Sequence, residues 1–489
     1  MNKRTSLCLA LFLALPAFGR EDYTRNFDKT VTMQAAQRLR VEHKFGDIVV
    51  HTHANPELVI HAVIRTSASD AKEARRYAES VRITVEPAGS DMLIETVYPK
   101  QEAGGWFGRN VSYSVNFEIL MPDSSPLALR NSFGAVSVND LKASSEIATS
   151  HGRLEFRNGR GNQRLENSFA PISVSGIAGE LDLSDTNGDI NIADVTGGID
   201  VRDRFGKVTV SRTGGGKIVD GNGAVRANTI SGPLNITTSF APVNANDIKG
   251  NLIVHNQNGD IEAIAVKGAA ELLTGFALVH FENVAGPVTV HAGNSGIRGH
   301  NVQGSAILQN SFAPVDVSEI RKDASVTSQN GNVSLADVGE GVTVKTSFGL
   351  VKAERVGGAL RVENQNGGVN ASSIKGGVNV KTSFSGVNLD AVGGSVEVEN
   401  QNGSVQVNST RGKVCEPISI RTSFAPVQVR IPSDGGYTVS AKTSFGNIHS
   451  DLPMLVSGLL TQDSVNGKIG SGACPMNLIN QNGNIDILK

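Results

Sequence analysis

The chain has 489 residues, of which 45 are lysine or arginine and 47 are aspartate or glutamate. This near-neutral balance argues against nucleic acid as a partner, because binding to phosphates requires a basic face. Length alone would predict about three domains, but glycine is abundant, with 54 residues, and internal repeats overrule that expectation.

The first residues have the features of a bacterial export signal. A positive region at residues 3–4 precedes an apolar run over residues 7–18, and small residues follow at a cleavage position near residue 19. We expect residues 1–19 to be removed, so that the mature chain begins near Arg20 and lies in the periplasm, outside the cell or at the cell surface. No later segment approaches the length of a transmembrane helix, and none is expected in the mature chain.

Residues 20–130 carry no regular repeat and are typical of a small β-rich domain. The pattern predicts one helix over residues 70–80, with Asp70 and Glu73 placed as a capping box. Strands are predicted over residues 38–53, 57–66, 80–86, 91–97 and 111–121. We expect this domain to cap the repeat region that follows, because an uncovered end would expose a row of unpaired strand groups.

Phenylalanines recur at a nearly constant distance after residue 130. Steps of 36 residues, with a single step of 35, separate Phe133, Phe169, Phe205, Phe240, Phe276, Phe312, Phe348 and Phe384. Asn-Gly pairs lie halfway between most of them, so the unit is 18 residues long and two kinds of unit alternate. A short, fixed period of this kind is the sequence signature of a solenoid.

Each unit predicts two short strands separated by two bends. Val315 and Val317 alternate with polar residues, as do Ala324 and Val326, which is the period of a strand with one buried face. One bend lies at the Phe or Asn-Gly position. The other carries a column of glycines, which we expect to supply the positive φ angles of a tight corner. These glycines stand at positions 232, 250, 268, 286, 304, 358, 376 and 394.

Units of equal length with their corners in register predict an all-β fold, a parallel β-solenoid with each strand paired to its copy one coil away. We expect a right-handed β-helix with regular 18-residue coils over residues 131–411, followed by irregular C-terminal coils and a cap over residues 412–489. Cys415 and Cys474 are the two cysteines of the mature chain, and in an exported protein we expect them to form a disulfide.

A column of short polar residues stands two positions before each Phe or Asn corner. Stacked Asn and Thr side chains there can hydrogen-bond one another and the backbone, so we interpret the column as structural. Three successive members are Asp185, Asp203 and Asp220, which stacking would bring within roughly 5–10 Å. Carboxylates so close must share protons, bind a cation or pair with bases, and the nearby bases are Arg202, Arg204 and Arg212. A salt-bridged stretch of wall is favoured over a calcium site or an acid/base pair.

Two aromatic features are candidate binding sites. Trp106, the only tryptophan, lies beside Phe107 and Arg109 in a glycine-rich segment that could contact a sugar or a protein partner, although an ordinary hairpin tip has the same sequence. The column of phenylalanines could stack on sugar rings if it were exposed. So many exposed rings would favour aggregation, and burial is therefore the favoured interpretation.

Four histidines fall close together in the N-terminal domain, at His43, His51, His53 and His61. Imidazoles are common metal ligands, but this spacing matches no standard metal site, so a metal is a minor hypothesis.

The chain resembles a family of bacterial exported proteins described as putative adhesins, whose shared domain has no assigned function. The resemblance covers most of the mature chain and rests on three segments, His43-Lys44-Phe45-Gly46-Asp47-Ile48-Val49-Val50, Asn131-Ser132-Phe133-Gly134-Ala135-Val136 and Asn187-Gly188-Asp189-Ile190-Asn191-Ile192. It implies binding at the surface or in the periplasm, and it supplies no active-site residues.

These observations predict a non-catalytic, adhesin-like binding or structural module of the bacterial envelope that presents a repetitive face to glycans or envelope proteins. We expect it to be a monomer and to need no cofactor. The alternative is a carbohydrate-active β-helix enzyme that cleaves polysaccharides. An active site needs an asymmetric cleft, and the coils over residues 131–402 hold their length too regularly to build one. A shared fold does not by itself imply a shared function. The regularity of the coils favours the binding module over the enzyme.

Overall fold

The computed structural model describes residues 20–99, 111–409, 415–432, 435–458 and 461–489. The chain forms two compact units, Met1–Ser173 and Val174–Lys489. The predicted export signal and the segment that contains Trp106, Phe107 and Arg109 lie outside the described residues.

The first unit contains long antiparallel strands, one helix and the first parallel coils. Its elements are β1 (Glu21–Thr32), β2 (Arg38–Glu42), β3 (Ile48–His53), β4 (Glu57–Ala68), α1 (Ala71–Ser80), β5 (Arg82–Ala88), β6 (Asp91–Val97), β7 (Ser112–Pro122), β8 (Leu127–Arg130), β9 (Val136–Asn139), β10 (Ser145–Ala148), β11 (Leu154–Arg160) and β12 (Gln163–Glu166). One sheet runs β1–β4–β7–β3–β9–β11, and the other runs β5–β6–β2–β8–β10–β12. The parallel pairing typical of the coils therefore begins at β2 and β3.

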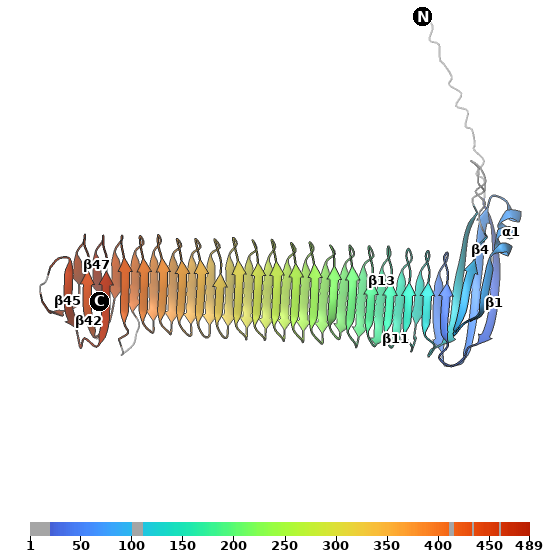
Figure 1. Cartoon of the computed structure of the whole chain (residues 1–489), viewed down its shortest axis with the longest axis horizontal. Coiled ribbons are helices and arrows are strands. Elements are labelled where there is room, and N and C mark those ends of the chain that lie inside the picture. Colours follow the sequence, from blue (N-terminus) through green and yellow to red (C-terminus); the bar gives the residue numbers. More distant parts are fainter. Residues whose placement is uncertain (1–19, 100–110, 410–414, 433–434, 459–460) are drawn as a thin grey trace, which may run out of the picture. The chain divides into compact units, whose positions relative to one another are not determined.

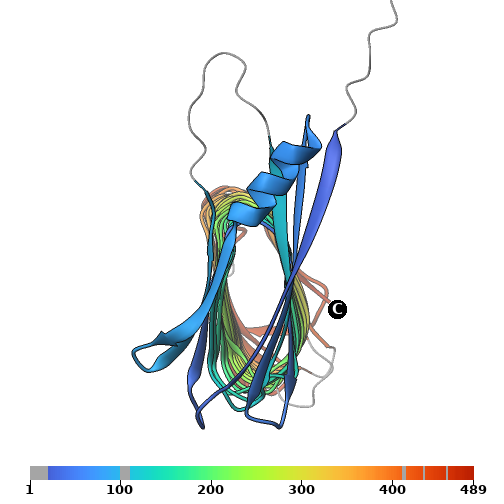
Figure 2. The same ribbon diagram turned by 90° about the vertical axis from the view of Figure 1, so that its right-hand side faces the viewer.

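Helix α1 begins where the sequence predicts it. The Asp70 carboxylate accepts a hydrogen bond from the backbone N–H of Lys72 at 3.2 Å, which caps the first turn. Ala74 and Ala78 are buried, and the helix packs against β1 and β4 (Figure 2). Among the described residues, no helix is long and apolar enough to cross a membrane.

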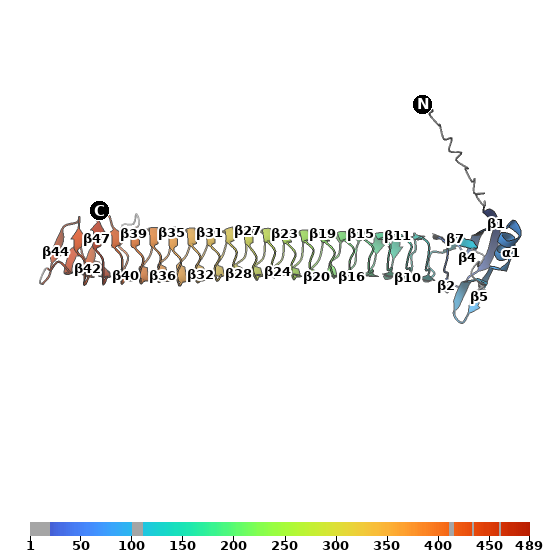
Figure 3. The same cartoon turned by 90° about the horizontal axis from the view of Figure 1, so that it is seen from above.

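The second unit is a parallel β-solenoid in which odd- and even-numbered strands form two facing sheets (Figures 1 and 3). The odd strands are β13 (Ile172–Ala178), which crosses the unit boundary, β15 (Ile190–Val195), β17 (Val208–Thr213), β19 (Val225–Ile230), β21 (Val243–Ile248), β23 (Ile261–Val266), β25 (Val279–Val284), β27 (Ile297–Val302), β29 (Val315–Ile320), β31 (Val333–Val338), β33 (Val351–Val356), β35 (Val369–Ile374), β37 (Val387–Val392), β39 (Val405–Ser409) and β41 (Val427–Arg430). The even strands are β14 (Leu181–Ser184), β16 (Ile199–Asp203), β18 (Gly216–Asp220), β20 (Leu234–Thr238), β22 (Leu252–Asn256), β24 (Ala270–Thr274), β26 (Val288–Ala292), β28 (Ala306–Asn310), β30 (Ala324–Thr327), β32 (Val342–Thr346), β34 (Leu360–Asn364), β36 (Val378–Thr382), β38 (Val396–Asn400) and β40 (Ile418–Thr422).

Each of these strands pairs in parallel with the strand one coil further on. Val315 lies opposite Val333, and Ala324 lies opposite Val342, so equivalent residues of successive coils stack directly. Viewed along the stack, the coils of this unit superimpose (Figure 2). The predicted all-β solenoid with 18-residue coils and one helix is confirmed, and the right-handed sense of the coil remains a prediction.

In most odd strands, the last residue but one has backbone angles in the left-handed region. In β31, Val333 and Leu335 point inward, Asp337 has a φ of 56°, and Val338 points inward again. The left-handed residue shifts the alternation by one position, so that an apolar side chain can close the core just before the bend. The same column includes Arg355, with a φ of 55°.

The glycines of the following bend, which we call the glycine corner, have a different role from the predicted one. None of the predicted corner glycines, from Gly232 to Gly394, is among the residues of positive φ. A Cβ atom on Gly286 would instead lie 2.5 Å from the carbonyl oxygen of Gly268 in the preceding coil. The expectation of positive φ was therefore wrong, and these glycines allow successive backbones to approach closely. Where Lys322 and Glu340 interrupt the column, the coil-to-coil N···O distance between them is 3.4 Å, against 3.1 Å between Gly286 and Gly268.

The C-terminal coils do not follow chain order. These elements are β42 (Tyr437–Lys442), β43 (Ile448–Ser450), β44 (Met454–Val456), β45 (Ser464–Ile469), β46 (Cys474–Ile479) and β47 (Ile485–Leu488). Strand β46 lies between β40 and β42, and β47 lies between β41 and β43, so the final segment is inserted between two earlier coils. An antiparallel pair, β44 and β45, lies beyond β42.

A disulfide joins Cys415 to Cys474, with their Cα atoms 5.8 Å apart. Cys474 is the first residue of β46, and Cys415 lies shortly before β40. Strands β40 and β46 pair with each other, although 59 residues separate the two cysteines. The bond therefore links the inserted final coil to the coil on which it packs.

We expect Gly286→Ala to destabilise the solenoid by about 1–3 kcal/mol, because the added methyl group overpacks the contact with the Gly268 carbonyl. Gly296→Ala is the matched control, since its Cβ would approach no atom closer than 3.4 Å. Urea unfolding of both variants measures the difference. Equal midpoints for the two would contradict the close-approach explanation.

We expect the double variant Cys415→Ala/Cys474→Ala to lower the opening free energy of β46 and β47 by about 4 kcal/mol in the chain-entropy model. Hydrogen exchange measures this locally. Amides of β20 to β24, far along the stack, should exchange as in the wild type, because solenoid coils are coupled mainly to their neighbours. Unchanged protection of β46 would show that pairing alone holds the inserted coil.

Candidate functional site

In the second unit, the chain bends between each even strand and the next odd strand, and we call this column of bends the aromatic corner. Every second bend carries an exposed phenylalanine. Phe240 lies between β20 and β21, and 61% of it is exposed. Its equivalents are between 51% and 67% exposed, and they are Phe205, Phe276, Phe312, Phe348, Phe384 and Phe424. The prediction that this column is buried is therefore wrong.

The bend itself explains the exposure. Thr238 ends β20 with its side chain buried, and a continuing strand would point Phe240 inward as well. The chain bends at residues 239–241 instead, so the alternation of the strand no longer applies. The sequence held a usable signal, because the same column holds asparagine in the intervening coils, as at Asn222, and a site that accepts both side chains is unlike a core site.

The first unit has an equivalent corner with different contents. Phe45 stacks on Phe133 with ring centroids 5.2 Å apart, and His151 stacks between Phe133 and Phe169 at 4.6 and 4.7 Å. A flat ring in every coil makes a continuous stack there. In the second unit asparagine occupies alternate coils, so each phenylalanine ring lies two coils away from the next ring in its column.

Beneath the aromatic corner runs the predicted column of buried polar side chains. Asn364 donates from Nδ2 to the carbonyl of Gly349 at 2.8 Å, and its Oδ1 accepts from the N–H of Gly367 at 2.9 Å. Thr382 donates from Oγ1 to the Gly367 carbonyl at 2.9 Å in the same manner. Each side chain thus bonds the corner of the preceding coil, which supports the structural interpretation of this column.

Asp185, Asp203 and Asp220 occupy the same column on successive coils, as predicted from their spacing. Asp203 and Asp220 lie directly opposite each other in the paired strands β16 and β18, and all three are buried. An ionised carboxylate cannot donate a hydrogen bond to the corner of the preceding coil as Asn and Thr do. Burial, followed by the charges of Asp220 and Asp185, raises the pKa of Asp203 to about 6. Burial likewise raises the pKa of Asp185 and of Asp220.

The predicted arginine partners bind elsewhere. Arg202 pairs with Asp182 and Asp200 on the outer face, at 3.0 and 2.5 Å. Arg212 donates two hydrogen bonds to Asp194 at 2.6 and 2.8 Å. The remaining base of the predicted set, Arg204, lies over the ring of Phe205 at 5.3 Å. The outer face of this stretch is salt-bridged, as expected, but the expected pairing of these arginines with the three buried aspartates is wrong. The three aspartates form a desolvated acidic column.

The four histidines of the first unit are dispersed. His43 is buried and hydrogen-bonds Thr96 Oγ1 at 3.1 Å, and burial lowers its pKa to about 4. His53 bonds the Glu57 carbonyl, and His61 bonds Asp28. Within the described ranges, no three His, Cys, Asp or Glu side chains are grouped so that they could hold a metal ion.

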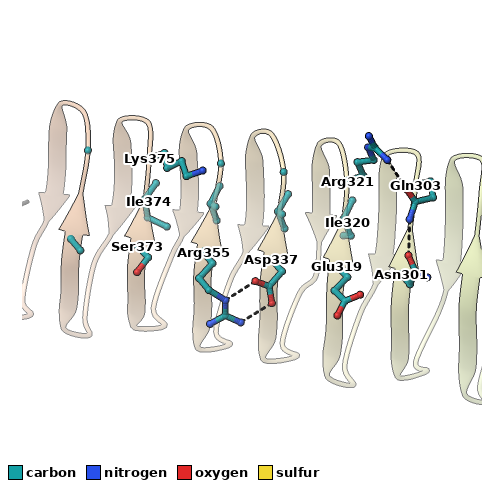
Figure 4. A pocket seen from close by; sticks show the side chains of 16 residues that line it. Asn301, Gln303, Glu319, Ile320, Arg321, Asp337, Arg355, Ser373, Ile374 and Lys375 are labelled. Carbon is teal, nitrogen blue, oxygen red and sulfur yellow. Dashed lines mark hydrogen bonds and ion pairs between the residues drawn. The ribbon is translucent and has the colours of Figure 1, made fainter.

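A groove of about 800 Å³ follows the ends of the odd strands near the glycine corner (Figure 4). Asp337 and Arg355 face each other in it, and the guanidinium donates to both carboxylate oxygens at 2.6 and 2.7 Å. Arg321 donates to Gln303, which donates in turn to Asn301. Because Asp337 is held in this ion pair, which lowers its pKa, it is poorly suited to act as a general acid.

A second groove, of about 880 Å³, lies beside the aromatic corner across β30 to β40. Its walls carry the amides of Gln329, Gln365 and Gln401 and the hydroxyls of Ser347 and Ser383. The same groove is also lined by charged side chains, which are Lys345, Glu363, Lys381, Glu399 and Arg421. Its amides and hydroxyls can bind a ligand through hydrogen bonds, which suits recognition.

We expect Asp203→Asn to stabilise the protein at pH 7 by on the order of 3 kcal/mol, because an amide can donate where the buried carboxylate cannot. A carboxyl whose folded pKa is raised favours folding at low pH, so its contribution is lost as pH rises from about 4 to about 6. The gain should therefore vanish near pH 4. Thermal unfolding between pH 4 and pH 8 measures it, with the exposed Asp316→Asn as control. A destabilised Asp203→Asn variant at pH 7 would contradict this account.

Comparison with known proteins places the chain in a family. No curated protein matches it. A crystal structure of a putative cell adhesion protein from Clostridium sporogenes matches over 95% of this chain and 99% of that one, with 9% identity and a TM-score of 0.16, which is too low to support any statement about fold or function. A family model described as Toastrack DUF4097 matches residues 245–488. Over these residues, which include most of the aromatic corner, the chain belongs to the Toastrack DUF4097 family.

Proposed function

We propose that this protein is a non-catalytic, adhesin-like binding module of the bacterial envelope, and that it binds its partner along the aromatic corner. The observation that carries the proposal is the regular row of phenylalanines from Phe205 to Phe424, each more than half exposed. The proposal places the protein after export in the periplasm or at the cell surface, as a monomer whose partners are glycans or envelope proteins.

The exposed row supports binding on energetic grounds. Burying a phenylalanine stabilises a structure by roughly 1.5–3 kcal/mol relative to leaving it exposed. Fold stability gains little from rings such as Phe276, which is 67% exposed. A repeated, costly exposure of apolar surface is typical of an interaction site.

The environment of the acidic residues supports a non-catalytic role. Asp203 lies beneath the corner and is only 7% exposed, so a sugar chain on the surface could not reach its carboxylate. Most glycoside hydrolases use two carboxyl groups that flank the scissile bond, and the buried Asp203 carboxyl cannot serve as one of them. A polysaccharide-cleaving enzyme is the alternative function, and an activity assay distinguishes it from a non-catalytic binder.

We expect protein beginning at Arg20 to bind peptidoglycan sacculi or outer-membrane vesicles saturably in a sedimentation assay. The triple variant Phe276→Ser/Phe312→Ser/Phe348→Ser should lose most of this binding, because it removes three neighbouring rings from the corner. Ile307→Ser is the matched control, since Ile307 is an exposed apolar residue on the outer face of β28.

Equal binding by the triple variant and the wild type would contradict the proposal. Release of new reducing ends from the bound polysaccharide would replace it with the enzymatic alternative.

A further inference from the structure

Between Phe312 and Phe424, the coils of the aromatic corner alternate between two chemistries. One kind carries serine and phenylalanine at successive bend positions, as at Ser347-Phe348 and Ser383-Phe384. The other carries two amides, as at Gln329-Asn330, Gln365-Asn366 and Gln401-Asn402. The glutamines of this second kind are exposed, so rings and amides reach the same surface in alternate coils.

The distance between successive phenylalanine rings follows from the spacing of the stacked strands. Paired strands lie about 4.8 Å apart, so rings two coils apart are separated by about 10 Å. This distance is close to the two-sugar repeat of an extended β-1,4-linked pyranose chain. In such a chain every second sugar presents the same face in the same direction, which matches a ring in every second coil.

The side chains have the chemistry that such a chain requires. An aromatic ring has a negatively polarised face, on which the C–H groups of a pyranose can stack. Amides both donate and accept hydrogen bonds, so Gln365 and Asn366 can bind the hydroxyl groups of the intervening sugar. The groove of about 880 Å³ continues this polar surface next to the rings.

The charges along this groove favour an uncharged ligand. Lys345 lies 3.5 Å from Glu363, and Lys381 lies 3.2 Å from Glu399, so positive and negative groups alternate and pair between coils. Arg421, which also lines the groove, continues the alternation opposite Glu399 in the next coil. A polyanion would need a surface of one sign. The pairing therefore argues for a neutral polysaccharide over an acidic one.

A second copy of this chain is a poorer fit to the same surface. Two interlocking rows of phenylalanines would require apolar sockets between the rings, because packing of rings is what would drive the association. The coils between the rings carry amides such as Gln329 and Asn330 instead. Burying these groups against a ring without hydrogen bonds would be unfavourable.

We propose that the aromatic corner between Phe312 and Phe424 binds a neutral, extended β-1,4-linked polysaccharide, with one disaccharide for every two coils. Each phenylalanine stacks on one sugar, and the following amide coil hydrogen-bonds the next. This inference rests on the proposed function and specifies its ligand class.

Isothermal titration of the protein from Arg20 with chito-oligosaccharides and cello-oligosaccharides tests the inference. The dissociation constant should fall by about threefold to tenfold with each added disaccharide from dimer to hexamer, because each addition reaches one more ring. Malto-oligosaccharides and laminari-oligosaccharides of equal length are the linkage controls. They should bind at least tenfold more weakly, because their chains do not keep the two-coil repeat.

Two variants separate the contributions of rings and amides. The variant Phe348→Ser/Phe384→Ser should abolish the increase in affinity with oligosaccharide length. The variant Gln329→Ala/Gln365→Ala should weaken binding, while the preference for the β-1,4 linkage remains. Ile307→Ser again serves as the control, and circular dichroism establishes that each variant is folded.

The outcomes distinguish this inference from the proposed function. Binding to sacculi or vesicles that depends on the phenylalanines, without binding to β-1,4-linked oligosaccharides, would overturn the ligand class and leave the binding function standing. Absence of binding that depends on the phenylalanines in every assay would overturn both. A dimer in light scattering that the Phe348→Ser/Phe384→Ser variant loses would assign the corner to self-association instead.

Discussion

Parallel pairing between coils of constant length is the constraint on which the rest of the second unit depends. A single coil has no second surface on which to bury its apolar side, so its stability comes from its neighbours. Because Val315 must lie opposite Val333 and Ala324 opposite Val342, every corner must recur at the same place. The buried polar column enforces this register. The Asn364 side chain hydrogen-bonds both the Gly349 carbonyl in the corner of the preceding coil and the Gly367 N–H in its own corner.

The same constraint gives the surface its character. Any side chain that points outward is repeated one coil away, so the outer face consists of columns whose members interact with one another. Lys381 pairs with Glu399 in one column, and Arg355 pairs with Asp337 in another. The aromatic corner is a column in which neighbouring members do not satisfy each other, because rings and amides alternate there. Its groups remain available to a partner, which is why this column and not the ion-paired ones is the strongest candidate for binding.

The sequence was sufficient to predict the strands and their stacking, because inside a strand the alternation of Val333 and Leu335 with polar residues fixes which face is buried. It was insufficient at the corners, where that alternation does not hold. Phe240 was assigned to the core because its hydrophobicity was weighed without the direction of the bend at residues 239–241. The left-handed residue found in most odd strands could not be foreseen either, since Asp337 and Arg355 have no common chemistry that marks the position. The insertion of β46 between β40 and β42 is a long-range arrangement that no local pattern encodes.

The acidic column shows how local departures from the repeat accumulate at one place. Asp203 and Asp220 are 17 residues apart instead of 18, and the shortened coil contains Gly215 and Gly216 with φ angles of 113° and 134°. Gly216 lies opposite Ile199 and Leu234 and contributes no side chain to the core that these residues help to fill. The missing apolar contact and the buried carboxylates lower the stability of the same coil. Because the stability of a solenoid is approximately a sum over coils and their interfaces, this coil contributes less to the stability of the stack than a regular coil does. Its deficit becomes smaller as the pH falls and Asp203 is protonated.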